Sequence, residues 1–282
     1  MKYNHKLNNM SRALADMGTD VLPNIGCAII GLAEVENSKA LDDLIAQPAL
    51  SARNYQYVHI EGPDRRGIDC ALLYNPSLFS VKNTRLVPYV QKLKKDSAFY
   101  TRGFLTVSGT LAQAISAKNN ASKALEQAKD ALAKVKAIKD SLLNDDPNCK
   151  VFVMGDMNDD PMDKSMSEAL RGKANINEMG EGDMYNPWYN VLAKEGAGTL
   201  QYQGSWNLFD QILLSKNLLN ANGSKDYSSL KYWKNQIFKR DYLFQTEGKY
   251  KGMPKRTTAG GVWLDGFSDH LPVVVYLVKE KQ

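Results

Sequence analysis

The sequence predicts an α/β fold in which apolar strands alternate with amphipathic helices. Two observations lead to this prediction. Residues 27–33 and 150–156 are short apolar runs that end at acidic residues, a pattern typical of buried strands. Residues 4–17 place four apolar side chains at helical spacing, which is typical of an amphipathic helix.

Further apolar segments are bounded by charged or turn-forming residues, as β-strands usually are. The first two of these segments are separated by the charged, turn-forming residues 61–67. The remaining segments alternate with helical stretches, so layers of helix and sheet are expected. The further predicted strands are residues 55–60, 68–75, 209–215 and 270–278.

Residues 113–143 have a different character from the rest of the chain. Eight alanines lie among Lys, Glu, Gln and Asp, and one apolar stripe runs from Leu125 to Leu142. This pattern predicts a long amphipathic helix, preceded by a loose segment at 118–122. Residues 171–204 are rich in Gly, Asn and Tyr and predict long surface loops, whereas residues 227–257 show no regular period.

The composition excludes several classes of protein. The chain has 282 residues, of which 43% are hydrophobic and 24% are charged, so it resembles an ordinary globular protein rather than a disordered or collagen-like one. No segment approaches the ~20 apolar residues of a membrane span. The net charge of +5 (36 − 31) fits an anionic partner such as a phosphate ester but does not identify one. We expect a single domain over residues 1–282.

The amino-terminal residues and the cysteines bear on the compartment. The start, MKYNHKLNNM, lacks the apolar core of a secretory signal, and the three cysteines have no paired spacing. A reducing, cytoplasmic compartment is therefore the default expectation. A secreted or periplasmic protein from which the signal peptide had been removed would show the same features.

Apolar strands of this sequence repeatedly end or begin with acidic and amide residues. Strand ends in a parallel or mixed sheet meet along one rim, where ligands usually bind. Carboxylate and amide oxygens suit Mg²⁺, with Mn²⁺ as an alternative, whereas thiols and imidazoles are too scattered for a soft metal. Each acid alone could be a turn residue or a helix cap, but together they favour a metal-assisted site. The residues are Glu34, Asp156, Asn158, Asp210, Asp269 and His270.

Five segments combine into a recognisable pattern: GLAEVEN (31–37), DRRGIDCALLYNP (64–76), VMGDMNDDP (153–161), WNLFDQILLS (206–215) and GFSDHLPVVV (266–275). They resemble the endonuclease/exonuclease/phosphatase superfamily. That superfamily includes deoxyribonuclease I-like nucleases, abasic-site endonucleases, inositol polyphosphate phosphatases and neutral sphingomyelinases. The resemblance covers most of the chain outside 113–135 and the loops after 171. It implies a four-layer sandwich of two mixed sheets packed face to face, with helices outside.

The resemblance also implies roles for individual residues. Glu34 and Asp269 match metal-binding carboxylates of the family. Asp156 and Asn158 match the aspartate and asparagine that position the attacking water and the phosphate. A metal ion held there would polarise a phosphoryl oxygen, and an ionised Asp156 would orient or deprotonate water.

Two further residues match the family's proton-transfer pair. His270 matches the catalytic histidine, and Asp210 matches the aspartate that holds that histidine in its working orientation. The imidazole would transfer a proton or stabilise developing charge. A histidine that merely caps a helix or lies on the surface is the alternative for His270.

Weaker candidates for contact with a substrate phosphate are Arg65, Arg66, Arg102 and Tyr74. Arginine can clamp a phosphate through two parallel hydrogen bonds. Salt bridges with Asp64 or Asp69 would explain the arginines equally well, and packing in the core would explain the tyrosine. His59 alternates with two tyrosines along one strand, so we expect it to be a packing or rim residue.

Two elements of the family are missing from the sequence. The family begins with a strand that ends in a metal-binding Asn, whereas this chain starts with the helix that follows it. The family also carries a strand ending in an Asn-His pair, whereas residues 112–127 here read AQAISAKNNASKALEQ. The chain has three histidines, and neither His5 nor His59 replaces the missing one. Loss of one of two cooperating histidines costs about 10²–10⁴ in rate.

The expected function is Mg²⁺-dependent hydrolysis of phosphate esters, with a nucleic acid phosphodiester as the substrate. One alternative is a catalytically impaired member of the family that acts as a binding or interaction module; the missing Asn-His strand and the Ala-rich helix favour it. A second alternative is a phosphoesterase acting on phosphoinositides or sphingomyelin.

Overall fold

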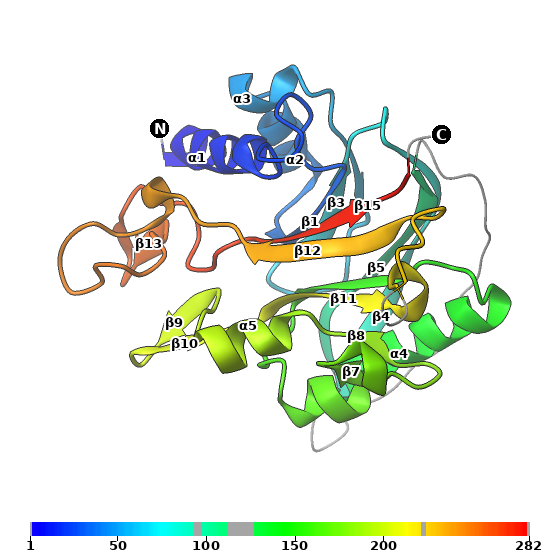
Figure 1. Cartoon of the computed structure of the whole chain (residues 1–282). Helices are drawn as coiled ribbons and strands as arrows, with labels where there is room; N and C mark the ends of the chain where they lie inside the picture. Colours follow the sequence, from blue (N-terminus) through cyan, green and yellow to red (C-terminus); the bar gives the residue numbers. More distant parts are fainter. Residues whose placement is uncertain (1, 93–97, 112–126, 221–223, 281–282) are drawn as a thin grey trace. The chain divides into compact units, whose positions relative to one another are not determined.

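The computed structural model describes residues 2–92, 98–111, 127–220 and 224–280, and it has the mixed α/β architecture that the sequence predicts (Figure 1). The chain forms two compact units. Unit 1 comprises residues 1–88, 100–113 and 237–272, and unit 2 comprises residues 89–99, 114–236 and 273–282. Each unit is therefore built from segments that lie far apart in the sequence.

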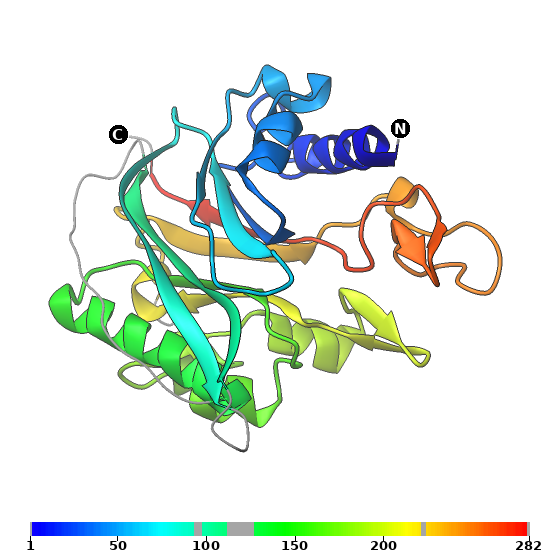
Figure 2. The same ribbon diagram turned by 180° about the vertical axis from the view of Figure 1, so that it is seen from behind.

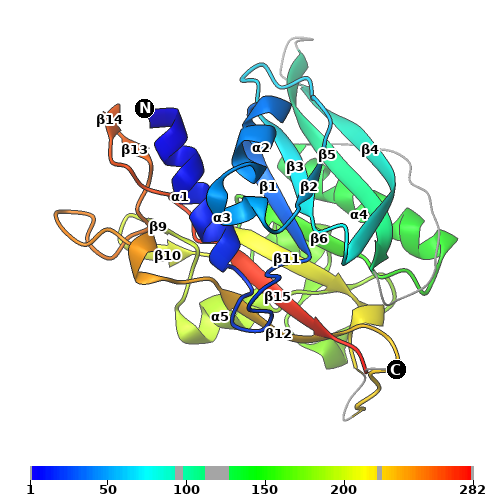
Figure 3. The same ribbon diagram turned by 90° about the horizontal axis from the view of Figure 1, so that it is seen from above.

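Unit 1 combines three helices with a three-stranded antiparallel sheet. Its helices are α1 (Lys2–Asp16), α2 (Ser38–Ile45) and α3 (Pro48–Ser51), and its sheet has the order β1 (Ile29–Val35), β3 (Asp69–Tyr74), β2 (Gln56–His59). The three helices lie close together (Figure 3). Leu7 and Leu14 of α1 are buried, which confirms the predicted amphipathic helix. Asn37 caps α2 by accepting a hydrogen bond from the backbone of Ala40 at 2.9 Å.

A long two-stranded ladder, a one-turn helix and a small hairpin are the other elements that contribute to unit 1. Strands β4 (Phe79–Lys92) and β5 (Ala98–Leu111) form a long two-stranded ladder that contributes residues to both units (Figure 2). A one-turn helix, η4 (Asp241–Leu243), precedes the small hairpin of β13 (Thr258–Ala259) and β14 (Val262–Trp263). Gly260 and Gly261 form the turn of this hairpin with φ of 54° and 79°, a conformation that favours glycine.

Unit 2 contains a four-stranded sheet and a second ladder. The sheet has the order β6 (Phe152–Asp156), β11 (Asp210–Ser215), β8 (Met184–Tyr185), β7 (Gly172–Lys173), and β12 (Lys231–Ile237) pairs with β15 (Val273–Val278). A separate hairpin joins β9 (Leu200–Tyr202) to β10 (Ser205–Asn207). The helices are α4 (Gln127–Asp145), α5 (Trp188–Glu195), η1 (Ser165–Ala169), η2 (Ile176–Glu178) and η3 (Lys216–Leu218).

Alternate side chains of β11 pack on opposite faces of this sheet, as the two-residue period of a strand requires. Leu213 belongs to a buried cluster with Val153 and Met166, against which Val135 of α4 packs. Leu214 lies in a second cluster, which Val275 of β15 joins. Unit 2 thus has a helical layer on one face and a second ladder on the other. The four-layer sandwich of two mixed sheets remains a prediction.

The structure corrects the prediction that the apolar runs 27–33 and 150–156 are buried strands. In β1, Gly31, Ala33 and Glu34 are exposed, and in β6 Met154 is 41% exposed. Both are edge strands among the strands described, since β3 alone pairs with β1 and β11 alone pairs with β6. Both pairings are antiparallel, and the four-stranded sheet of unit 2 is mixed because β7 and β8 run parallel.

A second correction concerns residues 171–204, predicted to be surface loops. They contain η2, three short strands and α5, and Trp188 is fully buried. Its indole nitrogen donates a hydrogen bond to the carbonyl of Ile212 at 3.0 Å. The predicted long helix corresponds to α4, whereas the loose segment at 118–122 lies outside the described residues. In the described part of the chain, no helix is long and apolar enough to cross a membrane.

The buried cluster around Leu213 gives the first testable prediction. Leu213 has no exposed surface, so replacing it with alanine should lower the free energy of unfolding by about 2–5 kcal/mol. Met154→Ala, at an exposed position on the paired strand, should change it by less than about 0.5 kcal/mol. Urea denaturation measures both values, and equal losses would contradict this description of the core.

Candidate functional site

The pairing of β6 with β11 brings two of the predicted acids together in unit 2. Asp156, the last residue of β6, is the direct cross-strand partner of Asp210, the first residue of β11. Directly paired residues lie on the same face of a sheet, and two like charges there are unfavourable unless a positive group lies near them. Asn158 follows in a tight turn, with φ of 53° and with its backbone N–H donating to Asp156 Oδ1 at 3.0 Å.

The loop after β6 is anchored to the segment that leads into β11. Asp160 accepts hydrogen bonds from Asn207 Nδ2 at 2.8 Å and from the Leu208 N–H at 2.7 Å. The Met157 N–H donates to the Phe209 carbonyl at 2.8 Å. These bonds fix the backbone on which Asp156 and Asn158 lie. Asp160 lies within the VMGDMNDDP motif but is not one of the site residues predicted from the sequence.

A buried amide connects this loop to the rest of unit 2. Gln211 is fully buried, and its Nε2 donates to the carbonyls of Asp159 at 2.8 Å and Leu208 at 3.0 Å. Its Oε1 accepts a hydrogen bond from Asn186 Nδ2 at 2.8 Å. Because buried amide groups are costly when unpaired, these bonds further restrict the position of the loop.

In unit 1, Glu34 lies at an irregularity of the β1–β3 ladder between Leu32 and Val35. Its φ of 60° is unusual for a non-glycine residue, and such strain often accompanies a functional position. The Glu34 side chain is 63% exposed, and its Oε1 accepts a hydrogen bond from Arg102 Nη2 at 3.4 Å. The predicted metal ligand therefore has an arginine as counter-charge.

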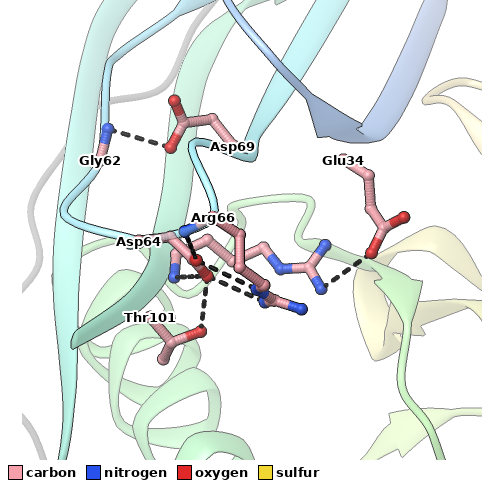
Figure 4. Close-up of polar contacts among 7 residues, drawn as sticks. Glu34, Gly62, Asp64, Arg66, Asp69 and Thr101 are labelled. Carbon is pink, nitrogen blue, oxygen red and sulfur yellow. Dashed lines mark hydrogen bonds and ion pairs between the residues drawn. The ribbon is translucent and has the colours of Figure 1, made fainter. Parts of the chain in front are cut away.

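The Asp64 side chain is completely buried and lies at the centre of a polar cluster in unit 1 (Figure 4). It accepts hydrogen bonds from the Arg66 N–H, Nε and Nη2 at 2.9, 3.1 and 2.9 Å. It also accepts from Thr101 Oγ1 at 3.2 Å and from the Arg102 N–H at 3.1 Å. Chiefly through the Arg66 side-chain bond, and against the effect of burial, this set holds the pKa of Asp64 far below its usual range.

A second buried carboxylate, Asp69, lies nearby and contacts a histidine. Asp69 accepts a hydrogen bond from the Gly62 N–H at 2.9 Å, and its other oxygen lies 3.2 Å from His59 Nε2. His59 Nδ1 lies 3.0 Å from Ser38 Oγ. The His59 side chain is thus buried and packs against its neighbours, which is one of the two roles predicted for it.

Asp269 and His270 lie on the segment of unit 1 that precedes β15. Asp269 Oδ2 accepts a hydrogen bond from Arg256 Nη2 at 2.8 Å, and both side chains are about half exposed. The His270 N–H donates to Ser268 Oγ at 3.2 Å. Lys6 of α1 donates to Thr257 Oγ1 at 2.6 Å and to the Phe267 carbonyl, which ties the helix to this segment. Burial lowers the pKa of Lys6, and the nearby Asp269 opposes this effect.

The weaker candidates for contact with a phosphate do not all lie at one place: the arginines lie near Asp64, whereas Tyr74 does not. Arg66 and Arg102 both contact Asp64, and Arg65 lies exposed in the same turn as Arg66. Tyr74 pairs with Ile29, at the end of β1 opposite Glu34, and donates a hydrogen bond to Gln56. The structure therefore does not bring Tyr74 to Glu34.

The chemistry of a metal site can be tested against these residues. Within residues 2–92, 98–111, 127–220 and 224–280, no three His, Cys, Asp or Glu side chains form a group that could hold a metal ion. The donors are nevertheless of the type that Mg²⁺ takes, and this ion commonly binds one or two protein carboxylates and completes its shell with water and phosphate. The residue types thus fit magnesium, although a closed ligand set is not observed in the described residues.

Comparisons with known proteins agree with the motifs. A model of the Endonuclease/Exonuclease/phosphatase family matches residues 1–279. TDP2 from D. rerio, solved with a single-strand DNA product, is 13% identical over 96% of this chain and 92% of that one, with a TM-score of 0.53. A family member from Bacteroides thetaiotaomicron is 15% identical over 98% and 90%, with a TM-score of 0.52.

A third solved structure, a mannosyl-6-phosphatase from Bacteroides thetaiotaomicron, is 14% identical over 96% of this chain and 91% of that one, with a TM-score of 0.50. At such low identities these likenesses show the fold alone. A search of curated proteins finds no significant match to this chain.

The buried Asp64 gives a prediction for the pH dependence of stability. Its pKa is lowered in the folded state, so its contribution to stability is present above the unfolded pKa of about 3.9 and is lost as the pH falls through the folded pKa. Asp64→Asn should therefore destabilise the protein at pH 7, and its difference from wild type should shrink progressively below about pH 4. Urea denaturation between pH 2.5 and 7 measures this difference, with exposed Glu36→Gln as the control. A constant difference over that range would contradict the assignment.

Proposed function

Because the chain belongs to the Endonuclease/Exonuclease/phosphatase family, we propose that it hydrolyses phosphate esters with the help of Mg²⁺, and that a nucleic acid phosphodiester is its substrate. The observation that carries this proposal is the direct pairing of Asp156, at the end of β6, with Asp210, at the start of β11, next to a loop that Asp160 holds in place. Two fixed carboxylates at one edge of a sheet provide the charge that a water-activating site requires.

The proposed roles follow the family resemblance. Asp156 orients or deprotonates the attacking water, and Asn158 helps to place the phosphate. His270 transfers a proton or stabilises developing charge, and Asp210 holds it in its working orientation. Arg66 and Arg102 bind phosphate oxygens, which the exposure of the Arg66 side chain supports.

Magnesium, or manganese in its place, would be held by Glu34 and Asp269 and would supply polarisation of the phosphoryl oxygen. Both side chains are about half exposed or more, so an ion could reach either of them from solvent. Their present partners, Arg102 and Arg256, would then be available for other anions.

Nucleic acid is favoured as the substrate by one structural neighbour. The D. rerio TDP2 structure contains a single-strand DNA product. A sugar phosphate is the competing substrate class, since another neighbour of similar TM-score is a mannosyl-6-phosphatase. The basic excess of this chain fits either class, so the two must be compared directly.

A binding or interaction module is the second candidate function. Residues 112–127 do not match the family's strand that ends in an Asn-His pair. In addition, β1 contains Glu34 and β6 contains Asp156, and both are edge strands among the described elements. A member of this kind would keep metal or phosphate binding and lose turnover.

Hydrolysis assays test the catalytic proposal. The wild type should cleave bis-p-nitrophenyl phosphate or plasmid DNA with Mg²⁺ or Mn²⁺, and His270→Ala and Asp156→Ala should each lower the rate by about 10²–10⁴. Mannose 6-phosphate serves as the monoester substrate for comparison. If wild type and both variants share one background rate, the protein is not a hydrolase of these esters.

Thermal unfolding tests metal binding separately from turnover. Mg²⁺ at about 100 times its Kd should stabilise the wild type by roughly 2.7 kcal/mol and raise its Tm, because the ion binds the folded state. Glu34→Ala should abolish this rise, whereas Glu36→Ala, at an exposed position two residues along, should retain it. An equal rise in wild type and Glu34→Ala would remove Glu34 from the metal site.

A further inference from the structure

The cluster around Asp64 has more hydrogen-bond donors than a turn requires. The Asp64–Gly67 turn is closed by its own backbone bond, from the Gly67 N–H to the Asp64 carbonyl at 2.9 Å. Yet the Asp64 carboxylate accepts five further bonds, three from Arg66 and two from residues 101–102. All five partners are donors. An ionised carboxylate can accept them all, whereas an amide would turn its NH₂ group toward other donors.

These bonds hold Arg66 by its guanidinium group and Arg102 by its backbone. Most of the side-chain N–H groups of the two arginines do not contact Asp64. Arg66 uses Nε and Nη2 on Asp64, and its side chain is still 53% exposed. A guanidinium has five N–H donors, so three remain that Asp64 does not engage. Arg102 is held through its backbone N–H, and its side chain reaches Glu34. The hydrogen bond to Asp64 raises the pKa of Arg66, and the negative charge of Glu34 also raises it. Both guanidinium groups are therefore influenced by the Glu34 carboxylate.

Two neighbouring residues show what is particular to this arrangement. Arg65 occupies the same turn as Arg66 and is exposed, but the described residues offer its side chain no hydrogen bond or ion pair. Asp69 is a carboxylate as buried as Asp64, yet its contacts are with Gly62 and His59 and not with arginine. Asp69 therefore serves as the matched control for Asp64.

We propose that Asp64 is a positioning residue that holds Arg66 and the backbone of Arg102 so that their guanidinium groups receive a substrate phosphate beside Glu34. The inference rests on the proposed phosphoesterase function and deepens it, because it assigns the phosphate-binding role to a preorganised pair of arginines. A fixed guanidinium loses less conformational freedom on binding a phosphate than a mobile one, and its planar fork matches two phosphate oxygens. Without Asp64 the fork of Arg66 would be free to rotate.

The experiment compares four variants in two independent measurements. Asp64→Asn and Arg66→Lys test the arrangement, whereas Asp69→Asn and Lys82→Ala, which removes an exposed cation of β4, are the controls. The first measurement is the affinity for inorganic phosphate by calorimetric titration, which requires no turnover. The second is KM and kcat for bis-p-nitrophenyl phosphate. Misplacing a binding group costs roughly 10- to 100-fold, so Asp64→Asn and Arg66→Lys should each weaken phosphate binding and raise KM by about 10-fold, with kcat nearly unchanged.

The double variant separates positioning from a general loss of stability. Asp64→Asn combined with Arg66→Lys should bind phosphate no more weakly than either single variant, because both changes remove the same fixed fork. Asp69→Asn should lower the Tm yet keep the phosphate affinity of wild type, and Lys82→Ala should keep both. If Asp69→Asn weakens phosphate binding as much as Asp64→Asn does, Asp64 has only a structural role.

Arg66→Lys keeps the test decisive even if Asp64→Asn fails to fold, because Arg66 is at the surface. Unchanged phosphate affinity in Arg66→Lys would overturn the proposal, as would a wild type that does not bind inorganic phosphate. If the wild type binds phosphate with the expected pattern of variants but hydrolyses no ester, the positioning role stands and the proposed hydrolysis fails.

Discussion

In each unit, a carboxylate that accepts hydrogen bonds from a distant segment fixes the loop that carries candidate functional residues. Asp64 joins the 64–67 turn to residues 101–102 of β5, and Asp160 joins the loop after β6 to residues 207–208. Charge-assisted hydrogen bonds are stronger than neutral ones, and a buried carboxylate is costly unless its partners stay in place. These contacts therefore stabilise particular loop conformations rather than the fold in general.

Much of this arrangement could be predicted from local sequence. The DRRG turn has Asp at its first position and Gly at its last, and the periodicity of residues 4–17 predicted α1 correctly. What the sequence could not provide is the partner across space. Nothing near Asp64 indicates that Thr101 will donate to it. Trp188 was assigned to a surface loop because one buried residue among Gly and Asn has no period to detect.

Among the described strands, β1 and β6 lie at the edges of their sheets. An edge strand has unpaired backbone groups and one side open to solvent, which explains why the apolar runs 27–33 and 150–156 are less buried than expected. Antiparallel pairing with β11 still brings Asp156 opposite Asp210. The pairing places both acids at the same end of a sheet that is mixed, because β7 and β8 run parallel.

The arginine partners of Glu34 and Asp269 raise the question of whether a metal ion could displace them. Each ion pair has a carboxylate that is more than half exposed, and exposed pairs generally contribute only about 0–1 kcal/mol, because water and salt screen them. A divalent ion has twice the charge of a guanidinium and can bind phosphate oxygens at the same time. The Arg102 backbone is held by Asp64, so its side chain can leave Glu34 without disturbing the strand. The ion pairs are therefore compatible with metal binding, and the released guanidinium would face an anion with its donors free.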